Sequence, residues 1–195
     1  MIEGPLVKDK VNFMLAGRRS YFDLFFPLFN SPELDNTTIY FYDLNIKINA
    51  KLSDKDRVFV SSYFGRDQFG ASDLFDFGWG NWTSTLRWNR LIRPTLFFNA
   101  TAVYSDYNYQ LGTPVDAEPA FIWDSRIENY VTNAGWTWYP NPAHTVDFGV
   151  QNTAYVFHPG AISGVFSLEL QQEYATEPAL YISDDWRITD VFTAT

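Results

Sequence analysis

Residues 39–52 read IYFYDLNIKINAKL, and apolar and polar side chains alternate along this stretch. The even positions from 40 to 52 are all apolar or aromatic, whereas the odd positions from 43 to 51 are Asp, Asn or Lys. Such alternation predicts a β-strand with one apolar face. The stretch is far longer than the usual strand of about five or six residues, and a tilted strand crosses a membrane with about 9 to 11. It therefore predicts a transmembrane strand whose even face meets lipid.

The same alternation recurs along most of the chain. Further strands are expected at residues 11–21, 57–68, 78–90, 95–109, 122–138, 144–157 and 174–188. These make about eight full strands, with the tail of another at 2–6 and the start of one at 191. The pattern predicts an all-β, antiparallel up-and-down transmembrane β-barrel, partial in extent, with residues 1–195 forming one domain.

The breaks between the strands are of two kinds. Short polar turns are expected at residues 7–10, 53–56, 93–95, 140–142 and 189–190, and long breaks near 22–38, 69–77, 110–120 and 159–173. Outer-membrane barrels carry short periplasmic turns and long extracellular loops. The two kinds alternate along the chain, so we expect the turns in the periplasm and the loops outside the cell.

Composition supports a membrane barrel and excludes other classes. Aromatic residues make up 19% of the chain, yet the mean hydropathy is only -0.21, as expected when each lipid-facing residue is followed by a polar one. No stretch approaches the roughly 18 apolar residues of a spanning helix. The net charge of -9 argues against nucleic acid as a partner. The chain has no cysteine and hence no disulfide scaffold.

Aromatic side chains gather near the ends of the expected strands, where amphipathic rings would lie at the headgroup level. β-strands favour aromatic residues anyway, which is the alternative explanation. The expected membrane-interface aromatics are Tyr40, Tyr42, Trp82, Trp88, Trp136, Trp138 and Trp186.

Several charged residues fall within the expected strands. A charge on the lipid face costs about 2 to 4 kcal/mol near the midplane, so these side chains should face the lumen or lie near an interface. They either line the lumen and contact ligand, or pair with neighbouring strands or a plug. Two tyrosines near a loop either form a ligand platform or belong to the outer girdle. The lumen or ligand candidates are Arg18, Arg66, Asp67, Arg87, Tyr107 and Tyr109.

No motif for catalysis or cofactor binding is present. The chain has no nucleophile elbow, no phosphate-binding glycine loop and no metal-spaced Cys/His cluster. His144 in a turn and His158 at a loop entry should be a membrane thickness apart, so they are not expected to share a metal. We expect neither an enzyme nor a cofactor.

Four strings resemble one family in their order. EGPLVKDK at 3–10, with GRRSY at 17–21, resembles the first barrel hairpin of TonB-dependent outer-membrane receptors of the Bacteroidetes type. LSDKDR at 52–57 with YFGRD at 63–67 resembles the next hairpin, and YPN at 139–141 with FHPG at 157–160 a later one. Tyr181 with DWRI at 185–188 resembles a strand further on.

The resemblance implies a role in uptake. That family has a plug domain followed by a 22-stranded barrel, and it imports siderophores, cobalamin or oligosaccharides with energy relayed through TonB. The resemblance implies that this chain is the early part of the barrel, located in the bacterial outer membrane. Its partners would be outer-membrane lipid, the remaining barrel strands and the plug, with TonB reached only through the plug.

No TonB box, plug or signal peptide is recognisable in the sequence, so we expect the chain to lack its natural start and not to transport alone. Unpaired strand edges cannot face hydrocarbon, so the isolated chain is expected to form inclusion bodies. Two alternatives remain open: a complete small barrel serving as an adhesin or structural protein, and a soluble carbohydrate-binding β-sandwich. The sandwich predicts short strands and an apolar face packed on a second sheet.

Overall fold

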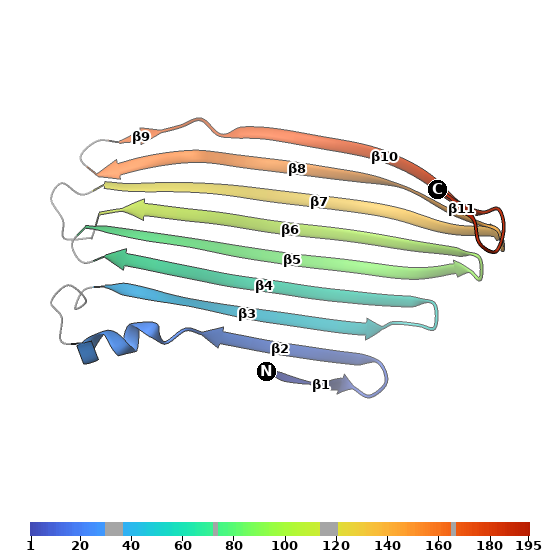
Figure 1. Ribbon diagram of the computed structural model, residues 1–195, viewed down its shortest axis with the longest axis horizontal. Coiled ribbons are helices and arrows are strands. Elements are labelled where there is room, and N and C mark those ends of the chain that lie inside the picture. Colours follow the sequence, from blue (N-terminus) through green and yellow to red (C-terminus); the bar gives the residue numbers. More distant parts are fainter. Residues whose placement is uncertain (30–36, 72–73, 114–120, 165–166) are drawn as a thin grey trace.

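The computed structural model shows strands lying side by side in one layer (Figure 1). It describes residues 1–29, 37–71, 74–113, 121–164 and 167–195. Within these ranges, eleven strands form a single sheet in the order β1-β2-β3-β4-β5-β6-β7-β8-β10-β11, and β9 pairs with β8. Sequential neighbours pair antiparallel, which is the expected up-and-down meander.

Eight of the strands are long, in agreement with the number expected from the sequence. They are β2 (Val11–Arg19), β3 (Thr38–Lys51), β4 (Asp56–Ala71), β5 (Phe75–Arg93), β6 (Leu96–Gly112), β7 (Phe121–Asn141), β8 (His144–Gly164) and β10 (Glu173–Arg187). The others are short: β1 (Ile2–Val7), β9 (Leu168–Glu169) and β11 (Thr193–Ala194). A 3-10 helix, η1 (Phe22–Phe29), lies between β2 and β3.

The two ends of the sheet differ in their connections. The links β1–β2, β3–β4, β5–β6, β7–β8 and β10–β11 contain two to five residues each, and all lie at the right-hand end in Figure 1. We call this the turn end and the opposite end the loop end. The expected separation of short turns from the other connections is confirmed.

Two expected loops are largely strand. β4 runs to Ala71 and β5 begins at Phe75, and β8 continues to Gly164, so the breaks expected near 69–77 and 159–173 are present but shorter than expected. Cross-strand pairing continues through these glycine-rich stretches, for example between Gly70 and Asp76, and overrides their weak strand propensity. Parts of the expected loops, at 30–36, 72–73, 114–120 and 165–166, lie outside the described residues.

A β-bulge allows strand β8 to continue past Pro159. Arg126 pairs with His158 but Asp124 pairs with Ala161, so the register shifts between these rungs. Gly160 has φ 155°, and a Cβ there would lie 2.7 Å from Nε1 of Trp123. Glycine is therefore required at this position. His158 lies inside the strand, which corrects its expected place at a loop entry.

The sheet has no core of its own. The chain exposes 13548 Å², whereas a compact monomer of 22.6 kDa would expose about 9,500 Å². Among the described residues, Phe26 is the one buried apolar side chain, and element contacts join only sheet neighbours and η1 with β3. The second sheet that the soluble sandwich requires is not found in these ranges, so that alternative is wrong.

The sheet is open. β1 lies at one edge and β10 with β11 at the other (Figure 1), and no pairing between these edges is found within the described ranges. The closed small barrel is therefore not the arrangement seen. Of the helices in the described part of the chain, none has the length and apolarity to span a bilayer.

Candidate membrane-facing and lumen-facing surfaces

One face of the sheet carries the even-numbered side chains of β3, and we call it the apolar face. Residues that pair across antiparallel strands share a face, so the register extends this face from strand to strand. Its centre, the apolar band, is mainly aliphatic and comprises Leu44, Ile46, Ile48, Val58, Val60, Leu86, Ala100, Ala102, Ala134, Val150, Ala154 and Leu180. Ser62, Ser84, Thr132 and Asn152 lie on the same face among them. Leu86 is 50% and Leu180 84% exposed, although both lie within the sheet.

Two aromatic rows border the apolar band. Toward the loop end, ring contacts join Trp82 to Tyr104 and Tyr104 to Tyr130, with centroids 5.4 and 5.1 Å apart. Tyr40, Tyr42 and Phe64 continue this outer row onto β3 and β4. Toward the turn end, the inner row runs through Trp88, Phe98, Trp136 and Phe148, with centroids 5.0 to 5.6 Å apart.

The seven aromatics expected at a membrane interface all lie on the apolar face. Tyr40, Tyr42 and Trp82 belong to the outer row, and Trp88, Trp136, Trp138 and Trp186 lie toward the turn end. From Tyr130 in the outer row to Trp136 in the inner row β7 advances six positions, or about 20 Å along the strand, and to Trp138 beyond that row eight positions, or about 27 Å. Barrels have an apolar band about 25 Å tall between their aromatic girdles, a comparable height.

The opposite face is polar at the same height. It presents Asn45, Lys47, Asn49, Ser61, Thr83, Thr85, Arg87, Asn99, Thr101, Asn133, Gln151 and Thr153. A shallow cavity of about 380 Å³ opens among Arg87, Asn99, Asp147 and Tyr181. Hydroxyl, amide and charged groups of this kind suit a water-filled or plugged lumen.

Tyr181 of β10 lies across two neighbouring strands on the polar face. A Cβ added at Gly135 of β7 or at Gly149 of β8 would come within 2.5 Å of the Tyr181 hydroxyl. Gly135 and Gly149 are paired with each other, and Tyr181 is paired with Gly149. The two glycines therefore leave the space that the phenol ring fills, and the contact fixes three strands in register.

Arg18 and Asp67 lie on the polar face near the loop end. Nε of Arg18 donates to Asp43, a carboxylate only 8% exposed, and the Arg18 guanidinium lies 5.3 Å from the Phe41 ring centre. Asp67 is close enough to interact electrostatically with Arg18. Arg18 thus pairs with a neighbouring strand, which is one of the two roles expected for it.

Arg87, Tyr107 and Tyr109 also lie on the polar face. Arg87 lines the cavity described above and makes no ion pair with any residue in the described ranges. Tyr109 pairs with Trp79 across β5 and β6, and its ring lies 6.4 Å from that of Phe77. Tyr107 is 42% exposed. The two tyrosines therefore do not belong to the outer aromatic row, which lies on the other face.

Arg66 lies on the apolar face, directly opposite Tyr42 in the β3–β4 pairing. Its Nη1 donates to Oδ1 of Asn108 over 3.2 Å, and the side chain passes over Gly80, where a Cβ would meet it at 3.6 Å. Arg66 therefore lies on the opposite face from the other five lumen or ligand candidates, beside the outer aromatic row, and not on the polar face. Successive residues of a strand point to opposite faces, so Arg66 and Asp67 are separated.

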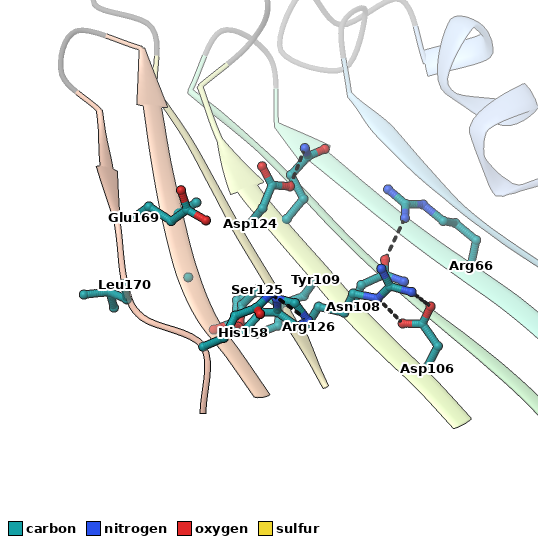
Figure 2. A pocket seen from close by; sticks show the side chains of 14 residues that line it. Arg66, Asp106, Asn108, Tyr109, Asp124, Ser125, Arg126, His158, Glu169 and Leu170 are labelled. Atoms are coloured by element: carbon teal, nitrogen blue, oxygen red, sulfur yellow. Dashed lines mark hydrogen bonds and ion pairs between the residues drawn. The ribbon is translucent and has the colours of Figure 1, made fainter. Parts of the chain in front are cut away.

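Arg66 belongs to a polar cluster that the sequence did not reveal, which we call the polar belt. It consists of Arg66, Asp106, Asn108, Gln110, Asp124, Arg126, Glu128 and His158, around a cavity of about 570 Å³ (Figure 2). Arg126 holds Asp106 through two hydrogen bonds of 3.0 and 2.6 Å. It also contacts Glu128 at 3.1 Å, and His158 lies 3.6 Å from Glu128.

The polar belt lies on the loop side of the outer aromatic row. Beyond Tyr130, β7 continues for nine more residues to Phe121, about 30 Å along the strand. The sequence contained a signal for the belt: Asp106, Asn108, Arg126 and Glu128 interrupt the apolar positions only in the half of each strand nearest a loop. No group of three or more potential metal ligands occurs in the described parts of the chain.

The fold has a solved counterpart. The ferric yersiniabactin uptake receptor FyuA from Yersinia pestis matches with a TM-score of 0.56 and 12% sequence identity, over 94% of this chain and 33% of FyuA. The chain has the fold of part of a TonB-dependent receptor barrel. It spans about a third of the length of FyuA. No protein-family model and no curated protein matches the sequence.

The likeness to the receptor barrel agrees with the two faces of the sheet. The fold resembles that of a transporter barrel. At 12% identity the match concerns the fold alone.

Proposed function

We propose that this chain forms part of the wall of a TonB-dependent receptor in the bacterial outer membrane, and that the receptor imports a siderophore, cobalamin or an oligosaccharide. The supporting observation is the apolar band, which lies between two aromatic rows on a sheet that is polar on its other face. An apolar face of this extent would be costly to leave in water. Acyl chains on one side and an aqueous lumen on the other satisfy both faces.

The remaining parts of the receptor complete the sheet in this proposal. Further strands pair with the free edges of β1 and β10, because unpaired backbone groups in hydrocarbon cost several kcal/mol each. A plug domain fills the lumen and contacts polar side chains such as Arg87 and Asn99. TonB acts on the plug, and the residues of this chain need no contact with it.

Ligand contact is proposed at the loop end of the polar face. Tyr107 and Tyr109 present rings there beside Trp79 and Phe77, and Arg18 with Asp67 lies on the same face. Aromatic rings and charged groups at the mouth of a barrel can hold a ligand before it passes the plug. Arg87 lies deeper and is placed to contact either the plug or a passing ligand.

Spin labels along β5 test the membrane assignment. The chain contains no cysteine, so labels can be attached at single Cys substitutions from residue 83 to 88 in the protein that carries this sheet, in native outer membranes. Accessibility to oxygen should be highest at even positions and low at odd ones, because only the even positions meet lipid. A profile without this period of two would overturn the proposal.

Growth tests address transport. A strain lacking the receptor should grow poorly when a ferric siderophore, cobalamin or an oligosaccharide is the limiting nutrient, and growth should return with the intact gene but not without TonB. Unchanged growth on all three classes, with the spin-label pattern intact, would reject uptake and favour a structural role for a membrane protein that contains this barrel wall.

A further inference from the structure

The helix η1 exposes an unusual amount of apolar surface. Five of its eight residues are large apolar side chains that are 54% to 76% exposed: Phe22, Leu24, Phe25, Leu28 and Phe29. Phe26 is buried, at 7% exposure, with its ring 5.6 Å from that of Phe22. Concentrated exposed apolar surface on a short segment marks a contact with a partner or a membrane.

The start of η1 is fixed to the apolar face of the sheet. Arg19 pairs with Tyr42 across β2 and β3, and its guanidinium lies 5.4 Å from the Tyr40 ring centre and 5.8 Å from that of Tyr21. Tyr40 belongs to the outer aromatic row. The preceding residue, Arg18, lies on the other face with Asp43.

The helix also begins at the height of the outer aromatic row. β2 contains nine residues, about the minimum that crosses a bilayer, and it ends at Arg19 opposite Tyr42. By contrast, β5 to β8 continue well past this row into the polar belt. On the β2–β3 side, η1 thus follows directly where the strand leaves the apolar band (Figure 1).

Charge does not keep η1 in water. Asp23 is the one charged residue of the helix, and its Oδ2 is held by Nη2 of Arg19 at 2.9 Å. Arg19 is itself stacked on tyrosines that face lipid in the proposed function. A cation near an anionic headgroup, beside apolar side chains that enter the acyl boundary, is the usual arrangement of an interfacial helix.

We propose that η1 is an interfacial anchor, which lies on the outer leaflet of the membrane and inserts Leu24, Phe25 and Leu28 into its acyl boundary. The partner is the lipid surface itself. This inference rests on the proposed function, because it requires the apolar face to meet lipid. Its consequence is that η1 lies flat on the membrane beyond the end of β2, whereas the loop ends of strands β5 to β8 project from it.

Three single-cysteine variants test the anchor in native outer membranes: Leu28→Cys on η1, Leu86→Cys in the apolar band and Gln110→Cys in the polar belt. Each carries a nitroxide label, and its accessibility to oxygen is compared with that to a water-soluble nickel complex. The label at residue 28 should favour oxygen, as the one at residue 86 does, although at a shallower depth. The label at residue 110 should favour the nickel complex several-fold.

The outcomes separate the anchor from the proposed function. A lipid signal at residue 86 with a nickel-accessible label at residue 28 would overturn the anchor and leave the barrel wall intact. A label at residue 28 that is shielded from both reagents would also overturn it, because protein and not lipid would then cover η1. If residue 86 gives no lipid signal, the barrel wall and the anchor both fail.

Discussion

Two regions of the apolar face, one above the other on the same strands, differ in chemistry. Between the aromatic rows the side chains are uncharged and mainly aliphatic, as at Leu86 and Val150, whereas beyond the outer row they form the polar belt around Arg126. The polar face changes in the opposite way. Between the rows it presents Asn99 and Thr101, whereas nearer the loop end it presents Trp79 and Tyr109. Alternation therefore assigns a residue to a face, but its height on the strand decides which medium that face meets.

The largest expected effect comes from placing a charge in each region of the apolar face. Leu86→Arg should lower the free energy of unfolding by about 2 to 4 kcal/mol, because Leu86 lies in the band that meets acyl chains. Gln110→Arg, on the same face in the polar belt, should change it by less than about 0.5 kcal/mol. Urea unfolding in lipid vesicles measures both, and equal effects would remove the distinction between the regions.

A second, smaller effect concerns the register of β7, β8 and β10, because this register sets the height of each residue in the sheet. Gly135→Ala and Gly149→Ala should each cost about 1 to 3 kcal/mol by overpacking against Tyr181. In a Tyr181→Phe background the cost of Gly135→Ala should largely disappear, because only the hydroxyl lies within 3 Å of its added Cβ. Gly149→Ala should remain costly, since the Ala134 carbonyl also lies 2.6 Å away.

The same unfolding assay measures the free energies of the two glycine variants alone and combined with Tyr181→Phe. Full rescue at both glycines, or at neither, would contradict the position of Tyr181 and with it the alignment of β7, β8 and β10.

The smallest effect is expected in the polar belt. Asp106→Asn should cost about 1 kcal/mol, because it weakens the two hydrogen bonds from Arg126, a partner that is itself partly exposed. Asp124→Asn is the control, since Asp124 accepts only a neutral bond from Gln110, over 2.8 Å. The difference between the two variants should shrink at high salt. A cost of several kcal/mol for Asp106→Asn would mean that the belt lies in hydrocarbon and not beyond it.

The sequence predicted the strands well and the loops poorly. The span expected at 39–52 matches β3 to one residue at each end, because strict alternation is a direct consequence of strand geometry. The breaks expected to include Gly70 and Gly160 begin later than predicted, since a glycine can mark either a loop or a place where a neighbouring side chain crosses the strand. At Gly160 the neighbour is Trp123, which is 37 residues away in the sequence and cannot be recognised from the local pattern.

For the candidate site, the sequence predicted which face of the sheet most residues occupy better than it predicted which residues lie close together. Asp67, Arg87 and Tyr109 were expected together and do share the polar face, but Arg66 does not, because neighbours on a strand cannot share a face. The polar belt escaped notice since its members come from β4, β6, β7 and β8, and each strand contributes only one to three polar residues. Their functional roles remain proposals.

The sequence by itself determined that this chain makes long two-faced strands joined by short turns at one end. Successive side chains of a strand point to opposite faces, so a two-faced strand shows an alternation that can be recognised in the sequence. Only the tertiary structure decided which residues lie at one height. Register depends on how each hairpin aligns two strands, and a single bulge, such as that at Gly160, moves every later rung. Cross-strand pairing therefore gathers Arg66, Asp106, Arg126 and His158 on one face.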